Sequence, residues 1–256
     1  MAALVGFALW LFLQPLFSRR RRRRLEQRPL PGPWRRQLQA ALPRHLRLAP
    51  PLQRRLEARV QVFLDGKRFH GCAGFAIDDE VRLTIAAHAC LLRLQPEADC
   101  YPGVREILVY PSAFWVHHPQ PDEFGLVDDA PDLLAGEAWQ QGRVILSWED
   151  VTAAVGGGPG NVVVHEFAHQ LDFETDTTVG APALADYGDW ATVFSTEFER
   201  LRAAGSPVLD AYGAENPAEF FAVAAEAYVQ SGAELARYHP ELYRLLREYF
   251  VIETAG

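Results

Sequence analysis

The segment His165-Glu166-Phe167-Ala168-His169 constrains this chain more than any other, because it has the pattern H-E-x-x-H. On a helix, residues four apart lie on one face, one turn apart, so both imidazoles can reach one metal ion. Glu166 projects in a neighbouring direction that suits holding a water molecule. The pattern is typical of the working core of a zinc metallopeptidase.

The flanking residues favour a helix at this segment. A cluster of glycines and a proline at 156–160 ends the preceding element, and Asn161 is a good N-cap. The helix predicted over 161–171 is otherwise apolar, so it should be buried, and buried histidines and glutamates need partners. The alternative to a metal site is a pair of hydrogen-bonded core histidines.

The composition of the 256 residues fits one sizeable core with an N-terminal extension. Three cysteines, Cys72, Cys90 and Cys100, cannot form a complete disulfide set, so we expect reduced thiols in a reducing compartment. The net charge is -8, and without the six arginines at 19–24 it is -14. An acidic folded part disfavours nucleic acid as a direct partner.

Residues 2–17 are almost wholly apolar, and the six arginines follow them. The stretch is just short of the usual membrane-spanning length, and its charges lie on the opposite side from those of a secretory signal. The positive-inside rule would keep the arginines and the main body in the cytoplasm. We therefore expect a cytoplasmic protein that residues 2–17 could anchor to the membrane; the alternatives are an interfacial anchor or a poorly ordered tail.

The segment 26–51 is rich in proline, arginine and leucine, and is predicted to be a linker that leads to short helices. Its arginines are interpreted as solvated faces rather than a binding patch. The predicted boundaries are therefore an N-terminal segment at 1–51 and a metallopeptidase domain at 52–256.

Hydrophobic periodicity predicts the elements of that domain. A short strand or turn is expected at 71–77, and strands at 107–110, 113–117 and 144–148. Helices are expected at 52–64, 79–94, 161–171, 189–204, 216–231 and 240–250. Strands that cluster before helices indicate an α+β fold, mostly helical with a small sheet, rather than a doubly wound parallel sheet.

A catalytic zinc ion usually takes a third protein ligand. The longer pattern H-E-x-x-H-x-x-G-x-x-H fails, because Asp172 and Thr175 stand at its glycine and final histidine positions. A carboxylate further along the chain is the natural candidate. Glu219 ranks first and Asp186 well below it.

Glu219 lies in a predicted helix that Asn216 caps and Pro217 opens. Glu226, seven residues on, shares a face of this otherwise apolar helix, so both acids need a cation or donors. Glu226 is the better candidate for supporting a ligand without touching the metal. The alternative for Glu219 is a capping box that never meets a metal ion.

The other histidines carry weaker signals. His117 and His118 would point to opposite faces of a strand and cannot easily share an ion, so a surface or loop role is expected. His70, His88 and His239 are isolated, and we expect structural roles for them.

The runs HEFAHQLD at 165–172 and NPAEFFAV at 216–223 resemble the Mlc titration factor A family of zinc peptidases, as do the stretches 84–87 and 109–114. The similarity covers roughly residues 55 to 250 and leaves out the apolar and arginine-rich N-terminus. It implies that His165, His169 and Glu219 bind zinc and that Glu166 is the catalytic acid and base.

The family's catalytic domain is similar to that of anthrax lethal factor, which implies a gluzincin-like fold. There, a tyrosine seven residues before the glutamate ligand assists catalysis, and Tyr212 stands seven before Glu219. The alternative for Tyr212 is an aromatic side chain packed on the core. Asp172 could orient His165 or bond to a nearby backbone, and Asp210 has no assigned role.

Three functions remain open. The first is a zinc-dependent peptidase in which Glu166 is the general base for a metal-activated water, with aminopeptidase activity on small or unfolded peptides implied by the resemblance. The second is a binding protein, since the family's namesake captures the transcriptional repressor Mlc and an acidic body suits a basic partner. The third is a degenerate enzyme with a structural metal, against which the intact Glu166 argues.

Overall fold

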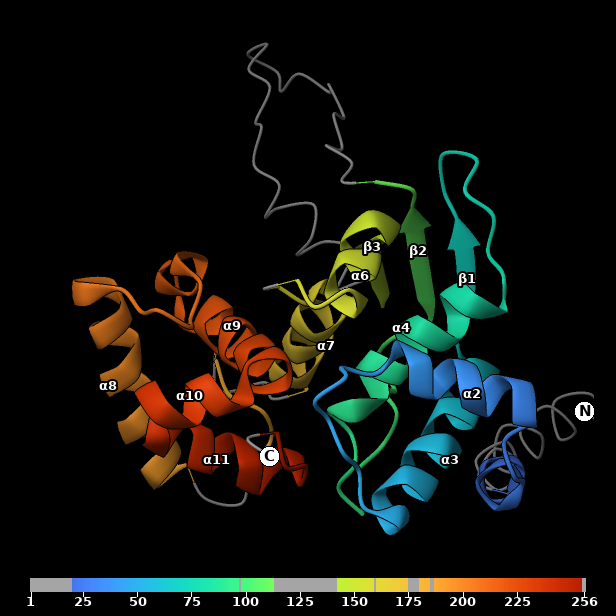
Figure 1. Cartoon of the computed structure of the whole chain (residues 1–256), viewed down its shortest axis with the longest axis horizontal. Helices are drawn as coiled ribbons and strands as arrows, with labels where there is room; N and C mark the ends of the chain where they lie inside the picture. Colours follow the sequence, from blue (N-terminus) through green and yellow to red (C-terminus); the bar gives the residue numbers. More distant parts are fainter. Residues whose placement is uncertain are drawn as a thin grey trace, which may run out of the picture.

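The computed structural model describes residues 20–96, 98–112, 142–158, 160–174, 180–184 and 187–254 (Figure 1). The predicted anchor at 2–17, the predicted strand at 113–117, the pair His117-His118 and Asp186 lie outside these residues. Among the described helices, none is both long and apolar enough to cross a membrane.

Helices dominate the described chain and surround a small sheet, which confirms the predicted α+β class at this level. In chain order the elements are α2 (Gly32–Ala41), α3 (Pro50–Gly66), β1 (Arg68–Gly71), α4 (Asp79–Leu91), β2 (Glu106–Tyr110), β3 (Arg143–Ser147), α6 (Trp148–Val155), α7 (Val162–Phe173), α8 (Gly188–Ala204), the 3-10 turn η1 (Ala211–Ala214), α9 (Pro217–Gln230), α10 (Gly232–Tyr238) and α11 (Pro240–Phe250).

The sheet has the order β1-β2-β3, and both strand pairs are parallel. Ile107 and Val109 of β2 are buried while their neighbours are half-buried, the alternation expected of a strand with one face on the core. The predicted strand at 144–148 begins one residue earlier and ends at Ser147. Ser147 ends it because its hydroxyl accepts a hydrogen bond from the Asp150 N–H and caps α6.

The prediction for 71–77 left a strand and a turn open, and the structure has a turn there. The strand lies earlier, at Arg68–Gly71, and the chain then reverses through a hydrogen bond of 2.9 Å from the Phe75 N–H to the Cys72 carbonyl. A Cβ atom on Gly71 would stand 1.8 Å from the Phe75 carbonyl oxygen, so only glycine fits at this reversal.

Helix α7 lies at the centre of the molecule (Figure 1). It packs against α4, α6 and β3 on one side and against α9 on the other. The side chain of Phe167 fixes its rotation, since its buried ring meets those of Phe63 and Tyr101 at centroid distances of 5.6 and 4.6 Å. Truncating such a ring typically costs about 3–5 kcal/mol. With Phe167 held there, the next face of α7 turns toward α9.

Helix α9 is held from its other side by an aromatic cluster. Trp190 and Phe194 of α8 stack at 4.1 Å, and Phe194 meets Phe220 of α9 edge to face at 5.6 Å. Such ring pairs add to the burial energy and restrict orientation. The acidic face of α9 is therefore presented to α7 by packing on both sides.

Helix α2 packs against α4, and Leu38 and Ala41 are buried. The segment 26–51, predicted to be a linker that leads to short helices, thus contains a helix that shares the core of the following residues. Cys90 and Cys100 are buried free thiols and Cys72 is a half-buried one, in agreement with the reduced state predicted.

Charge is distributed unevenly along the chain. Residues 20–68, which include α2 and α3, carry fifteen basic and three acidic side chains. Residues 69–256 carry nine basic and thirty acidic side chains. The arginines at 20, 21, 23 and 24 are exposed, so the positive charge lies at the surface of the N-terminal part.

Candidate metal centre

The first half of the site comes from α7. Its N-cap is Asn161, whose Oδ1 accepts a hydrogen bond of 3.1 Å from the Val164 N–H, as the sequence predicted. His165 and His169 follow one turn apart, with ring centroids 4.8 Å from each other. Both imidazoles project from the face of α7 that meets α9.

The second half comes from the start of α9. Asn216 caps this helix by accepting hydrogen bonds from the N–H groups of Ala218 and Glu219, and Pro217 occupies the first turn. The Glu219 carboxylate is not confined to capping, because its Oε2 atom lies 3.1 Å from His165 Nε2 and 3.4 Å from His169 Nε2.

The structure therefore brings together the three residues predicted as metal ligands. The two Nε2 atoms of His165 and His169 are 3.1 Å apart, so three potential ligand atoms surround a common point. His169 is 2% exposed and Glu219 8% exposed. Burial of this kind removes water as a partner for the polar atoms.

The chemistry of these atoms fits a cation. Glu219 Oε2 is buried and, among the described residues, accepts no hydrogen bond of good geometry. Two imidazole nitrogens and a carboxylate oxygen present lone pairs to one another, which is unfavourable unless a positive charge lies between them. Two histidines and a glutamate are a common ligand set of catalytic zinc. Hydrogen-bonded core histidines would not leave this oxygen without a donor.

Electrostatics favour ionised Glu219. Burial alone would raise its pKa, but the close contacts with the imidazoles of His165 and His169 lower the pKa of Glu219 to about 2. Burial alone would lower the pKa of His165, yet Glu219 and Glu226 raise it to about 10. Two carboxylates on one imidazole give the cluster a strong preference for positive charge, whether carried by protons or by a metal ion.

Glu226 meets the other side of the His165 ring. Its Oε1 accepts a hydrogen bond of 2.7 Å from His165 Nδ1. This is the supporting contact predicted for Glu226. A hydrogen bond at Nδ1 leaves Nε2 as the ring atom that faces the cluster.

The suggestion that Asp172 orients His165 is wrong, because Glu226 holds that nitrogen. Asp172 takes the other role that was considered: its Oδ1 accepts backbone N–H bonds of 2.7 and 2.9 Å from Gly180 and Ala181. Gly180 has a φ of +81°, and a Cβ there would stand 2.5 Å from the carbonyl oxygen of Pro217. Asp172 thus ties the chain after α7 against the start of α9.

Tyr212 and Glu166 border the cluster. The Tyr212 ring lies 6.1 Å from the His165 ring and is 39% exposed, so it is not a core side chain. Asp210 fixes its backbone by accepting a 2.8 Å hydrogen bond from the Tyr212 N–H. The next residue, Gly213, approaches Val223 of α9 so closely that a Cβ would stand 3.1 Å from it. Glu166 is half-buried on α7.

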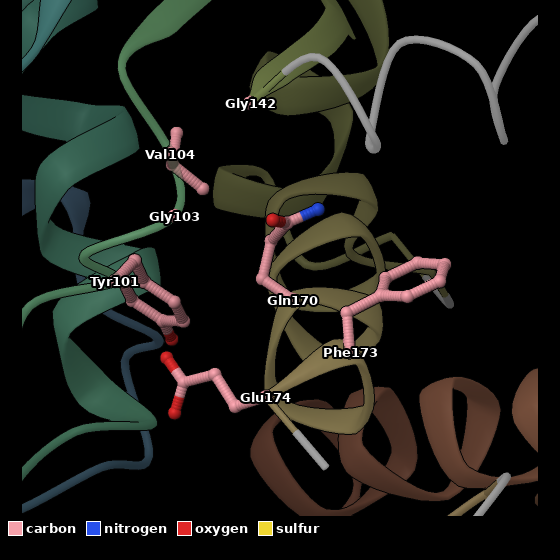
Figure 2. A pocket seen from close by; sticks show the side chains of 7 residues that line it. All are labelled: Tyr101, Gly103, Val104, Gly142, Gln170, Phe173 and Glu174. Carbon is pink, nitrogen blue, oxygen red and sulfur yellow. The ribbon is translucent and has the colours of Figure 1, made fainter. Parts of the chain in front are cut away.

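A pocket of about 260 Å³ lies near the C-terminal end of α7, away from the point where the three ligands converge (Figure 2). Tyr101 and Val104 lie across from Gln170 and Glu174, and Phe173 is a further lining residue. Gln170 and Phe173 lie one and two turns beyond Glu166 on the same side of α7. The side chains that could bind a metal ion thus lie in the cluster of His165, His169 and Glu219. The pocket borders the neighbouring face of α7.

Two residues of the site had only structural interpretations in the sequence. Asn161 was predicted as a helix cap, yet its main-chain N–H also donates to Glu226 Oε2 and its side chain contacts His88. His88 is isolated in the sequence and was expected to have a structural role, which its bonds to Asn161 and the Ala41 carbonyl fit. The partners of Asn161, which are Glu226 and His88, lie 65 and 73 positions away in the chain. Only the acidic face of α9 indicated that α7 needed a partner.

Two histidines one turn apart on a buried helix, a glutamate between them and a carboxylate from a second helix at the same point define a metallopeptidase. Comparison with known sequences agrees with the geometry. The chain belongs to the glucose-regulated metallo-peptidase M90 family, whose model matches residues 16–251.

The relatives cover most of the chain. An uncharacterized protein of Synechocystis sp. is 38% identical over 98% of this chain and 94% of its own length. Mlc titration factor A of Serratia proteamaculans is 32% identical over 79% of this chain and 82% of its own length. Its counterpart in Salmonella gallinarum is 31% identical over 82% and 83%. The resemblance to Mlc titration factor A is confirmed.

Proposed function

We propose that the protein is a zinc-dependent peptidase in which His165, His169 and Glu219 hold the metal ion. The observation that carries the proposal is the convergence of two Nε2 atoms and the unbonded Glu219 Oε2 within 3.4 Å of one another. Zinc is the natural ion, because two imidazoles and one carboxylate match its preferred ligands and leave room for water.

A zinc ion bound by these residues would act as a Lewis acid toward a peptide carbonyl and a water molecule. Glu166 would accept the proton of the attacking water and pass it to the nitrogen of the leaving amine, which breaks the C–N bond. The Tyr212 hydroxyl would donate a hydrogen bond to the oxygen of the attacked carbonyl as negative charge develops there. Its exposed position beside His165 supports this role.

The substrates proposed are small or unfolded peptides, with cleavage of the aminopeptidase type. The support for this is the resemblance to the Mlc titration factor A family, since the described residues do not select a side chain. A peptide library incubated with the full chain would define the preference. Hydrolysis confined to internal bonds would exclude the aminopeptidase type.

The central test is metal content. We expect the purified protein to hold about one zinc per chain, and Glu219→Ala to lose it, because two imidazoles alone bind zinc far more weakly. Elemental analysis measures both. Removal of the metal by a chelator should abolish peptide hydrolysis, and added zinc should restore it. Full zinc occupancy in Glu219→Ala would remove Glu219 from the ligand set.

A second candidate is regulatory binding, favoured by the relatives named Mlc titration factor A. The thirty acidic side chains after residue 68 suit a basic protein partner such as the DNA-binding part of a repressor. A pull-down of an Mlc-type repressor by Glu166→Gln would test it. Hydrolysis by the wild type without capture by this variant would favour the enzyme alone.

A further inference from the structure

We propose that Glu226 is a positioning residue of the metal centre. It holds His165 so that Nε2 points into the cluster, Asn161 holds Glu226 in turn, and His88 holds Asn161. The proposal rests on the proposed function, because it takes His165 to be a metal ligand.

The contact between Glu226 and His165 sets the tautomer of the His165 imidazole. Glu226 Oε1 accepts a hydrogen bond of 2.7 Å from His165 Nδ1. The proton of a neutral imidazole then sits on Nδ1, and the lone pair is left on Nε2, the atom 3.1 Å from Glu219 Oε2. A carboxylate in this place also makes the imidazole a stronger donor to a metal ion.

The second contact fixes the carboxylate itself. Glu226 Oε2 accepts a hydrogen bond from the main-chain N–H of Asn161. That N–H lies at the positive end of α7, where an anion is favourable. Both oxygens of Glu226 are therefore engaged, and the carboxylate has one orientation. A Cβ on Gly160 would stand 3.3 Å from Oε2, so the glycine lets the chain pass this close.

Asn161 is held through its side chain. It is fully buried, and its Oδ1 accepts the Val164 N–H while Nδ2 lies 2.7 Å from His88 Nδ1. Because Oδ1 must face a backbone donor, the amide has only one consistent orientation, with Nδ2 donating to His88.

His88 completes the series of bonds. Its Nε2 donates a hydrogen bond of 2.8 Å to the carbonyl of Ala41, at the end of α2, so Nδ1 is the acceptor that Asn161 requires. Burial lowers the pKa of His88 to about 4, although the bond to Ala41 opposes this. The imidazole is thus neutral at physiological pH. Consecutive hydrogen bonds link α2, α4, α7 and α9 to a metal ligand.

The described residues include a matched imidazole–carboxylate pair that belongs to no potential metal-binding group found among them. His239 Nδ1 donates a hydrogen bond of 2.6 Å to Glu197 Oε2, and both side chains are at least as buried as those of His165 and Glu226. Loss of this pair removes a buried imidazole–carboxylate bond but touches no predicted ligand. It therefore separates an effect on stability from an effect on the metal centre.

The test compares Glu226→Gln with the wild type in the full chain. Zinc affinity is measured by competition with a chromophoric chelator, and ligand geometry by the visible absorption spectrum of the cobalt-loaded protein. We expect affinity to fall about 10- to 100-fold and the cobalt bands to change. Glu226→Asp keeps the charge on a shorter side chain and should recover part of the affinity.

Glu197→Gln is the control, and it should lower thermal stability while zinc affinity and the cobalt spectrum stay those of the wild type. Wild-type affinity and spectrum in Glu226→Gln would overturn the proposal. If Glu226→Gln does not fold, Glu226→Asp and Asn161→Asp carry the test, and an unchanged cobalt spectrum in both would overturn it. A wild type that binds no zinc would instead refute the proposed function.

Discussion

Two buried imidazole–carboxylate pairs in this molecule have the same contact at Nδ1 of the histidine and different contacts at Nε2. His165 and His239 each donate from Nδ1 to a glutamate, at 2.7 and 2.6 Å. On the other side of the His239 ring, Nε2 lies 2.7 Å from the Ser206 hydroxyl. On the other side of the His165 ring, Nε2 meets another Nε2 and a carboxylate oxygen.

In the His239 cluster, both ring nitrogens and the Ser206 hydroxyl have hydrogen-bond partners. The Ser206 oxygen accepts N–H bonds of 3.1 Å from both Val208 and Leu209, while its hydrogen points to His239. The residues have the composition of a hydrolase triad, but both lone pairs of this oxygen are occupied and cannot attack a substrate. A histidine–glutamate pair is thus no sign of a reactive site. The partner of the second ring nitrogen distinguishes the two regions.

The largest effect is expected at the His165 cluster, where loss of Glu166 tests whether this region, unlike the His239 cluster, is catalytic. Glu166→Gln removes the proton acceptor while it preserves size and the three ligands, so kcat should fall by about 10²- to 10⁴-fold with zinc retained. Peptide hydrolysis and elemental analysis measure the two quantities. Wild-type turnover in this variant would mean that another group takes the proton.

A third buried imidazole, that of His88, has no carboxylate partner among the described residues, and the pH dependence of stability tests whether burial alone keeps it neutral. Burial lowers its pKa from 6.5 to about 4, so the unfolded chain binds the proton more readily than the folded one. Stability from this group is fully present above pH 6.5 and is lost as pH falls toward 4, by about 3 kcal/mol in all.

Urea unfolding of the wild type and His88→Gln across this pH range isolates that contribution, because the other titrating groups are common to both proteins. The wild type should lose more stability in acid than the variant does. Parallel curves would show that His88 is not held neutral by burial.

The smallest effect lies in the His239 cluster. Ser206→Ala removes the acceptor of two backbone N–H groups that have water as an alternative, since the loop is partly exposed. The free energy of unfolding should fall by about 1 kcal/mol, and peptide hydrolysis should not change. Thermal unfolding and the peptide assay check both. Loss of hydrolysis would place a reactive serine in this cluster after all.

Local signals made much of the site predictable. Helix α7 was marked at its start by Asn161 and by the glycines before it, and its two histidines have helical spacing. Helix α9 was marked by Asn216 and Pro217, and its two acids lie on one face. These features depend on neighbours within seven residues, so the sequence expresses them directly.

The remaining contacts join residues that are far apart in the chain. Asn161 meets Glu226 across 65 positions and His88 across 73. No local pattern predicts such pairs, because they follow from how α4, α7 and α9 pack. The role of Asp172 was ambiguous for the same reason. Its position on the ligand face suited a bond to His165, but the packing of α9 against α7 brings Glu226 to His165 Nδ1, and Asp172 bonds to the Gly180 backbone. Helices α6 and α10 were missed because they are short, with 8 and 7 residues, so each offers only about two turns of periodic signal.

The division of charge between residues 20–68 and the rest makes this molecule an electric dipole that its net charge of -8 conceals. A negatively charged surface or polymer would attract the end that bears α2 and α3 and repel the end that bears α8 to α11 (Figure 1). The protein should therefore be retained by a cation-exchange resin at neutral pH and low salt despite its acidic composition. On such a surface it would stand with the arginines inward and the C-terminal helices facing the solution.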